Sequence, residues 1–341
     1  MVMMLNSSGQ KAISPSQKSA DPEMLFVVLP PVRDLVRPLT DRTKTRARAL
    51  LATGFALLAL IISGQGMAQT VPKPVSELAS LTLLEGDNQS EPPSESVLWS
   101  ALDIKLAKNV KTYWRTVGDS GLPPVFTWTG SRNLQSVEVL WPAPIRFTDG
   151  SGSSIGYKDR VVLPLKVVAL DPKRPVELLL SLDYAVCETL CMPAHYTGKL
   201  TLTPIAARTS FNRALANNAA LIRDAQARVP VEIGLNTEAP LAVLSVKPDK
   251  NGLLIETRWA SDEPDGDLFL EGPEGWVFGK PVLHTQRHDG KARLLRTYRV
   301  SIDEKPGKDS PLQGLNLVAT LVAHPLATET RLTLDKSGQA P

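Results

Sequence analysis

An all-β protein with two sandwich domains and one connecting helix is predicted by two patterns in this 341-residue sequence. The first pattern is a series of short apolar, β-branched segments separated by turn residues, and it occurs once before residue 206 and again after residue 230. The second pattern is one stretch of helical periodicity between the two series. We therefore expect a β-sandwich, a helix and a second β-sandwich-like domain, in that order.

The first 68 residues are predicted to be a leader that ends in a secretory signal peptide. Basic residues between positions 42 and 48 precede an apolar run over 49–62, and small residues follow up to Ala68. The run is shorter than the ~20 residues that a membrane-spanning helix needs. We expect cleavage after Ala68, export to the periplasm, and no stable membrane insertion of the mature chain. The polar, proline-bearing residues 69–94 are expected to form a linker.

The excess of positive charge belongs to the leader. Lys and Arg outnumber Asp and Glu by 38 to 35 in the whole sequence, whereas the counts after residue 68 are 30 and 31. A chain without a basic excess lacks the electrostatic basis for binding nucleic acid or an anionic membrane. Nucleic acid is therefore excluded as an expected partner.

Six short segments within residues 95–205 predict the first sandwich. They are VLWSALDIKLA, VFTWTG, SVEVLWPAP, RVVLPLKVVAL, VELLLSLDYAV and GKLTLTPI. Alternating apolar residues such as Leu102, Ile104 and Leu106 have the period of a half-buried strand. Prolines within the segments favour edge strands or bulges over helices. The spacing of the segments is typical of an antiparallel sandwich.

Residues 206–230 are predicted to be a helical connector, because apolar residues from Phe211 to Ala225 recur at helical spacing and Pro230 follows them. The second series of strand-like segments predicts a β-sandwich over 231–335, which contains no cysteine, and residues 336–341 are expected to form a tail.

Both cysteines, Cys187 and Cys191, lie in LDYAVCETLCMPAHYTGKLTL, between two strand-like segments. One interpretation is a structural disulfide, the usual state of paired cysteines in exported proteins, although so short a loop gives only about 2 kcal/mol of stabilisation. A second is a metal site, in which His195 joins the cysteines at four-residue spacing and copper(I) is the best-suited ion. Pro193 argues against the helix that would bring these three side chains together.

A third interpretation is a redox pair that exchanges electrons with another protein through a mixed disulfide. The short spacing keeps the second thiol within reach of that mixed disulfide. Glu188 adds negative charge beside the pair, and no Lys or Arg lies between Pro175 and Lys199. We therefore expect a thiol pKa that is ordinary or raised.

Four segments together resemble a known family. KTYWRTVGDSGLPPVFTWTGS, VEVLWPAPIRF, SIGYKDRVVLPLKV and the cysteine segment are similar to the N-terminal periplasmic domain of the membrane thiol-disulfide reductase DsbD, including stand-alone and copper-sensitivity-suppressor proteins with that domain. The resemblance covers about residues 95–205. It implies an immunoglobulin-like sandwich with its cysteines on a strand hairpin, under a movable cap loop.

The resemblance also implies the roles of individual residues. Cys187 and Cys191 would carry the electrons, with Cys191 forming the mixed disulfide, and the cap would fall at 147–156 with Phe147 as its shield. Other residues expected around the pair are Tyr113, Tyr157, Tyr184, Glu188 and His195. The cysteine spacing is shorter than in the best-known members, and this sequence lacks their membrane and thioredoxin domains.

We therefore predict thiol-disulfide interchange, a protein-disulfide reductase activity, without a cofactor. A membrane-bound thiol reductase would supply electrons in trans, and periplasmic thioredoxin-like proteins would exchange them with the cysteine pair. The alternative is a non-catalytic periplasmic binding module, for copper or for another protein, that keeps a permanent disulfide. Only in that alternative would Cys187, Cys191 and His195 serve as metal ligands.

Overall fold

The computed structural model describes residues 73–86, 96–149, 152–204, 213–259, 266–290 and 293–340. The leader, its predicted signal peptide and the cleavage site after Ala68 lie outside these ranges. Residues 71–341 form one compact unit. Within the described ranges, every helix is too short or too polar to cross a membrane.

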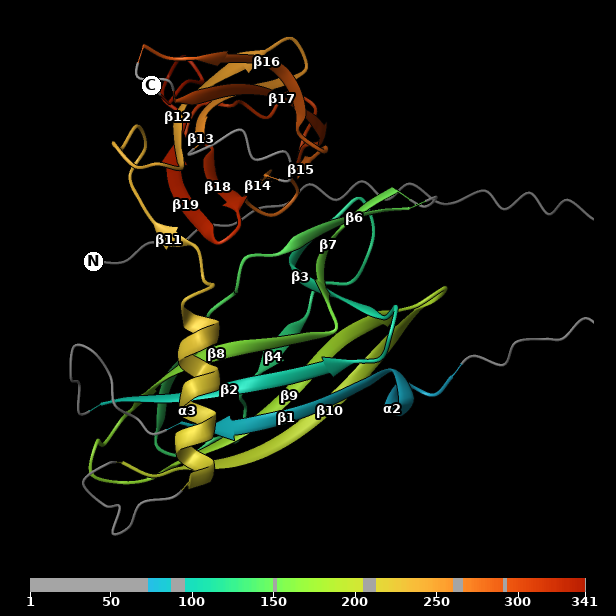
Figure 1. The fold of residues 1–341 in the computed structure, drawn as a ribbon, viewed down its shortest axis with the longest axis vertical. Coiled ribbons are helices and arrows are strands. Elements are labelled where there is room, and N and C mark those ends of the chain that lie inside the picture. The colour runs from blue at the N-terminus through green and yellow to red at the C-terminus, as the bar shows by residue number, and fades with distance from the viewer. Residues whose placement is uncertain are drawn as a thin grey trace, which may run out of the picture. The chain divides into compact units, whose positions relative to one another are not determined.

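Two helices and nineteen strands are described (Figure 1). In chain order they are α2 (Val75–Leu78), β1 (Ala79–Glu85), β2 (Val97–Leu106), β3 (Lys111–Gly118), β4 (Val125–Thr127), β5 (Leu134–Val139), β6 (Ile145–Asp149), β7 (Gly152–Lys158), β8 (Arg160–Ala169), β9 (Val176–Cys187), β10 (Cys191–Leu202), α3 (Arg213–Gln226), β11 (Val231–Glu232), β12 (Ala242–Asp249), β13 (Gly252–Trp259), β14 (Asp267–Glu271), β15 (Val277–Phe278), β16 (Val282–His288), β17 (Leu294–Glu304), β18 (Asn316–Ala323) and β19 (Leu326–Thr333).

The first sandwich consists of two antiparallel sheets. One has the strand order β1-β2-β8-β5, and the other has the order β10-β9-β3-β7-β6 with β4 alongside β9. Because side chains alternate between the faces of a strand, each sheet turns one apolar set inward. Leu102, Leu163 and Leu182 are among the side chains fully buried in this core. The predicted all-β, immunoglobulin-like sandwich is confirmed.

Strand β1 corrects the expectation that residues 69–94 form a linker. It pairs with β2 over its whole length, with Leu81 opposite Ile104 and Leu83 opposite Leu102. Leu81 and Leu83 pack against the core of the first sandwich. Their alternation is a strand signal, and burying them offsets the cost of ordering this segment.

Helix α3 lies within the predicted connector and packs on the first sandwich, across β8 (Figure 1). Its apolar face, Ala219, Ile222 and Ala225, is buried. After the helix ends, the backbone carbonyl of Arg228 accepts a 2.8 Å hydrogen bond from the amide of Ala143. The helix is therefore part of the first sandwich's surface as well as a connection to the second.

The second sandwich also has two sheets. One has the order β11-β19-β18-β14, and the other has the order β12-β13-β17-β15 with β16 also paired to β17. Val246, Leu253 and Ile255 are buried in its core.

The prediction that residues 336–341 form a tail is wrong for the described residues 336–340, which pack on the second sandwich. Ala340 is buried and exchanges two 2.8 Å backbone hydrogen bonds with Val246. Apolar burial and these bonds hold residues 336–340 against the sandwich.

Candidate functional site

The two cysteines lie at the facing ends of a strand hairpin. Strand β9 ends at Cys187, β10 begins at Cys191, and the antiparallel register places the two residues directly opposite each other. They are joined in a disulfide. The hairpin register explains why residues so close in sequence can be bridged, since opposite residues of an antiparallel pair bring their Cβ atoms close together.

The two sulfur-bearing residues differ in exposure. Cys187 is 2% exposed and belongs to a small buried cluster with Tyr113 and Ala185. Cys191 is exposed, and Leu190 beside it is 63% exposed. An incoming thiol can therefore approach Cys191 from solvent, whereas Cys187 is covered by protein.

Tyr113 touches both sulfurs. Its hydroxyl oxygen lies 2.9 Å from Sγ of Cys187 and 3.1 Å from Sγ of Cys191. Disulfide sulfurs carry no hydrogen, so the hydroxyl must be the donor in both contacts. Strand β3 delivers this side chain, because its neighbour Thr112 pairs with Val186 of β9 and donates a 2.8 Å side-chain hydrogen bond to the carbonyl of Ala185. Tyr113 is thus brought to the pair as predicted.

Lys111 is a site residue that the sequence analysis missed. It is paired with Cys187 across β3 and β9, so the two side chains share one face of the sheet. Its amine donates a 3.0 Å hydrogen bond to Oγ of Ser154 and lies 5.4 Å from the ring centroid of Phe147. Sequence proximity gave no sign of this cation, because Lys111 is 76 positions from Cys187. Only the strand order brings them together.

Phe147 lies on the same sheet face as the disulfide, and two strands, β3 and β7, separate its strand from β9. It is on β6, half-buried, and paired with Ser154 of β7. The expected cap at 147–156 therefore consists, in its described part, of the paired strands β6 and β7, and residues 150–151 lie outside the described ranges. Backbone and side-chain hydrogen bonds of 2.8 Å join Ser153 to Asp119, which ties the end of this hairpin to the loop after β3.

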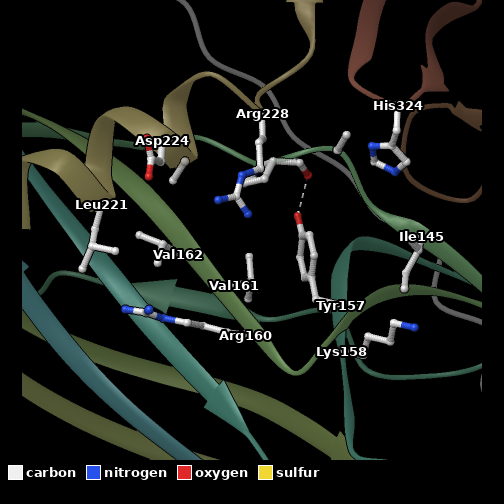
Figure 2. Close-up of a pocket in the computed structure, with 13 residues that line it drawn as sticks. Ile145, Tyr157, Lys158, Arg160, Val161, Val162, Leu221, Asp224, Arg228 and His324 are labelled. Atoms are coloured by element: carbon white, nitrogen blue, oxygen red, sulfur yellow. Dashed lines mark hydrogen bonds between the residues drawn. The ribbon is translucent and has the colours of Figure 1, made fainter.

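Tyr157 and Tyr184 lie apart from the disulfide, within the core of the sandwich. The hydroxyl of Tyr157 donates a 2.8 Å hydrogen bond to the carbonyl of Pro142 beside a cavity that Arg228 and His324 also line (Figure 2). Burial raises the pKa of Tyr157 well above its ordinary value. Tyr184 also points away from the disulfide. It precedes Ala185 in β9, and Ala185 lies on the face of Cys187, so Tyr184 points to the opposite face of the sheet.

Glu188 and His195 lie near the cysteine pair in sequence, but their side chains contact other residues. Both oxygens of Glu188 accept hydrogen bonds from the amine of Lys73, at 3.0 and 3.1 Å. Nδ1 of His195 lies 2.7 Å from a carboxylate oxygen of Asp183, and both side chains are exposed. The negative charge predicted beside the cysteines is thus paired with a cation from the segment before α2.

No group of three His, Cys, Asp or Glu side chains is arranged to hold a metal ion in the part of the chain that the structure describes. His195 is four residues along β10 from Cys191. At about 3.3 Å per residue, a strand separates such positions by roughly 13 Å. The strand conformation therefore keeps His195 away from the two sulfurs, although the four-residue spacing had suggested it as a third ligand in the copper alternative.

Comparison with known proteins identifies the class of the first sandwich. Residues 82–203 match the family model described as Thiol:disulfide interchange protein DsbD, N-terminal. This part of the chain is therefore a DsbD N-terminal-type domain. No curated protein matches the chain.

A solved structure is similar over most of the chain. It is the N-terminal periplasmic domain of ScsB from Proteus mirabilis, with a TM-score of 0.59 and 21% sequence identity over 78% of this chain and 96% of that one. At this identity the likeness establishes the fold. It extends beyond the family match, so it includes residues outside the first sandwich.

Proposed function

We propose that this chain is a periplasmic thiol-disulfide exchange protein that carries two electrons on Cys187 and Cys191. A membrane-bound thiol reductase would reduce the disulfide in trans, and the dithiol would then reduce a disulfide in a periplasmic thioredoxin-like protein. The family match, the periplasmic similar structure and the predicted signal peptide support this assignment.

The single observation that carries the proposal is the unequal placement of the two sulfurs. Cys191 is exposed, whereas Cys187 is only 2% exposed, and the Tyr113 hydroxyl lies against both sulfurs. A structural bridge has no need of one open sulfur and one protected sulfur. An exchange reaction does, because one sulfur must meet the partner and the other must wait to resolve the mixed disulfide.

The proposed reaction proceeds in two displacements. The thiolate of Cys191 attacks one sulfur of the partner disulfide, a mixed disulfide forms, and the partner's other sulfur leaves as a thiolate and takes up a proton. The thiolate of Cys187 then attacks Sγ of Cys191, and the partner leaves with both of its sulfurs reduced. Recharging by the reductase is the reverse sequence, in which an external thiolate attacks Cys191 and Cys187 is the leaving group.

Single-cysteine variants test this proposal. Reduced Cys187→Ser protein should form a stable mixed disulfide with an oxidised thioredoxin-like domain or with 5,5′-dithiobis(2-nitrobenzoate), because the resolving thiol is gone. Reduced Cys191→Ser protein should react with the thioredoxin-like domain at least about tenfold more slowly, because its remaining thiol is buried. Covalent complexes are counted by non-reducing electrophoresis and mass spectrometry.

The opposite pattern would favour the binding-module alternative. A wild-type disulfide that resists dithiothreitol in the folded protein, and variants that form no mixed disulfide, would mark a permanent bridge. Stoichiometric copper(I) retained by the reduced protein after gel filtration would mark a metal site instead.

A further inference from the structure

Strand β3 leaves its sheet directly after Tyr113. Its pairing with β9 covers Lys111 and Thr112, and its pairing with β7 runs to Tyr113 and then shifts, resuming only at Gly118. Residues 114–117 therefore form a bulge that has no register partner in the neighbouring strands β7 and β9. A bulge re-aims the side chains beside it, so whatever fixes this bulge also fixes Tyr113.

The second sandwich holds the first residue of this bulge. Trp114 is fully buried, and its ring packs edge-on against Phe269 of β14 with 5.8 Å between the centroids. Phe269 and Val322 of β18 belong to the same apolar cluster as Trp114 and the core of the first sandwich. This contact anchors the bulge by burial of large apolar surface.

An ion cluster holds the second residue. Nε of Arg115 donates to both carboxylate oxygens of Glu271, at 2.8 and 2.9 Å, and its NH2 group bonds to Glu329. Burial acts to lower the pKa of Arg115, but hydrogen bonds and the charges of Glu271 and Glu329 raise it above its ordinary value, so the guanidinium stays charged. Thr116 adds a 3.1 Å hydrogen bond to Glu271. Arg115 of β3 thus links the first sandwich to two strands of the second, β14 and β19.

Both ends of the bulge reach the cysteine site. Tyr113 contacts the two sulfurs, and Val117 packs against the cluster of Tyr113, Ala185 and Cys187. A shift of residues 114–116, which lie between these two contacts, would move the hydroxyl that faces the disulfide.

From this geometry we propose that the second sandwich positions the redox site, with Arg115 as the positioning residue that acts through Tyr113. This inference rests on the proposed exchange function and gives the second sandwich a part in it. When an external thiolate attacks Cys191, the electron pair of the S–S bond passes to Sγ of Cys187. The hydroxyl of Tyr113 donates to that departing thiolate, and a stabilised thiolate leaves faster.

The test is the rate of reduction of the disulfide by dithiothreitol in the full mature chain. Tyr113→Phe should slow the reaction about tenfold, because the departing thiolate loses a hydrogen bond from a neutral donor. Arg115→Met should slow it about threefold, because the hydroxyl is displaced but still present. Adding Arg115→Met to Tyr113→Phe should cause no further slowing, because the arginine acts only through the missing hydroxyl.

Arg331→Met is the matched control. Arg331 also binds Glu329, from within the second sandwich, and it forms a further ion pair with Glu232. The disulfide of the Arg331→Met variant should therefore be reduced by dithiothreitol at the wild-type rate. Glu271→Gln provides a second route to the same interface, because it keeps the size of the side chain and removes its charge. It should slow reduction in the same direction as Arg115→Met, even if Arg115→Met fails to fold.

Two results would overturn this inference and leave the proposed function standing. One is a wild-type rate in folded Arg115→Met and Glu271→Gln proteins, and the other is full additivity of Arg115→Met with Tyr113→Phe. If the wild-type disulfide is itself inert to dithiothreitol, the proposed function and the inference both fail. The rate of the wild-type protein therefore distinguishes failure of the proposed function from failure of this inference.

Discussion

At the scale of single residues, the site is defined by what surrounds two chemically identical side chains. Tyr113 lies against both sulfurs. Cys187 is buried and has Lys111 across the ladder, whereas Cys191 begins an edge strand and faces solvent. The sequence analysis expected no nearby cation and so an ordinary or raised thiol pKa. Lys111 lies across the ladder from Cys187 with its amine bound to Ser154, and we expect its positive charge to act in the opposite direction, because a nearby cation favours the thiolate.

Lys111→Met is expected to slow reduction of the disulfide about two- to threefold at low salt, since the departing thiolate of Cys187 loses a neighbouring positive charge. The rate with dithiothreitol should be measured at about 10 mM and about 500 mM salt, because screening weakens the effect of a partly exposed charge. Lys158→Met is the control, because Lys158 pairs with Lys111 on the side away from β9. Equal rates for both variants at low salt would refute a role for Lys111.

At the scale of elements, the loop from β3 to β4 determines where the Tyr113 ring can lie. Gly121 adopts a φ of +139°, and a Cβ added there would lie 2.4 Å from Cε1 of Tyr113. The backbone of this loop therefore packs directly on the ring. Asp119 in the same loop binds Ser153 at the end of the β6–β7 hairpin, so one loop links the tyrosine to the expected cap.

Gly121→Ala is expected to displace the Tyr113 ring, because neither the space nor the backbone conformation accommodates a side chain. Reduction of the disulfide should slow by an amount close to that of Tyr113→Phe, about tenfold, with a stability loss of about 1–2 kcal/mol. Stopped-flow reduction and urea unfolding measure the two effects. Gly290→Ala is the control, since an added Cβ there meets nothing within 4 Å. A variant that loses stability yet reacts at the wild-type rate would contradict this account of the loop.

At the scale of the whole molecule, residues 71–341 form one compact unit although the sequence predicts two sandwiches. Phe269 and Val322 of the second sandwich are buried in the apolar cluster of the first. Arg146 of β6 adds an ion pair with Asp267 and lies 4.8 Å from the Phe269 ring centroid. An interface with a buried aromatic pair and two arginine clusters is expected to couple the unfolding of the two sandwiches.

Phe269→Ala is expected to destabilise the protein by about 3–5 kcal/mol, because it leaves a cavity beside Trp114. The wild-type chain should unfold in a single transition, whereas the variant should show the sandwiches unfolding separately. Calorimetry gives the number of transitions, and tryptophan fluorescence follows them. Phe278→Ala is a useful comparison, because Phe278 packs on the core of the second sandwich. Two transitions already present in the wild-type protein would show that the interface does not couple the sandwiches.

The sequence by itself determined the strands and the cysteine pair. Period-two alternation, as in Leu102 and Ile104, depends only on neighbouring residues, so it could be recognised without the fold. The two cysteines and the segments around them also identified the family of the first sandwich, which the match over residues 82–203 confirms. The sequence predicts a linker where β1 lies, because residues 69–94 are polar and contain several prolines.

Only the tertiary structure decided which residues surround the disulfide. Tyr113 was expected there and reaches both sulfurs, whereas Tyr157 and Tyr184 point into the core. Lys111 and Arg115 gave no sequence signal, because their roles depend on strand order and on a bulge. A one-residue change of register reverses the face of every side chain in a strand. Local patterns therefore predicted the elements, while long-range pairing determined which side chains face the two sulfurs.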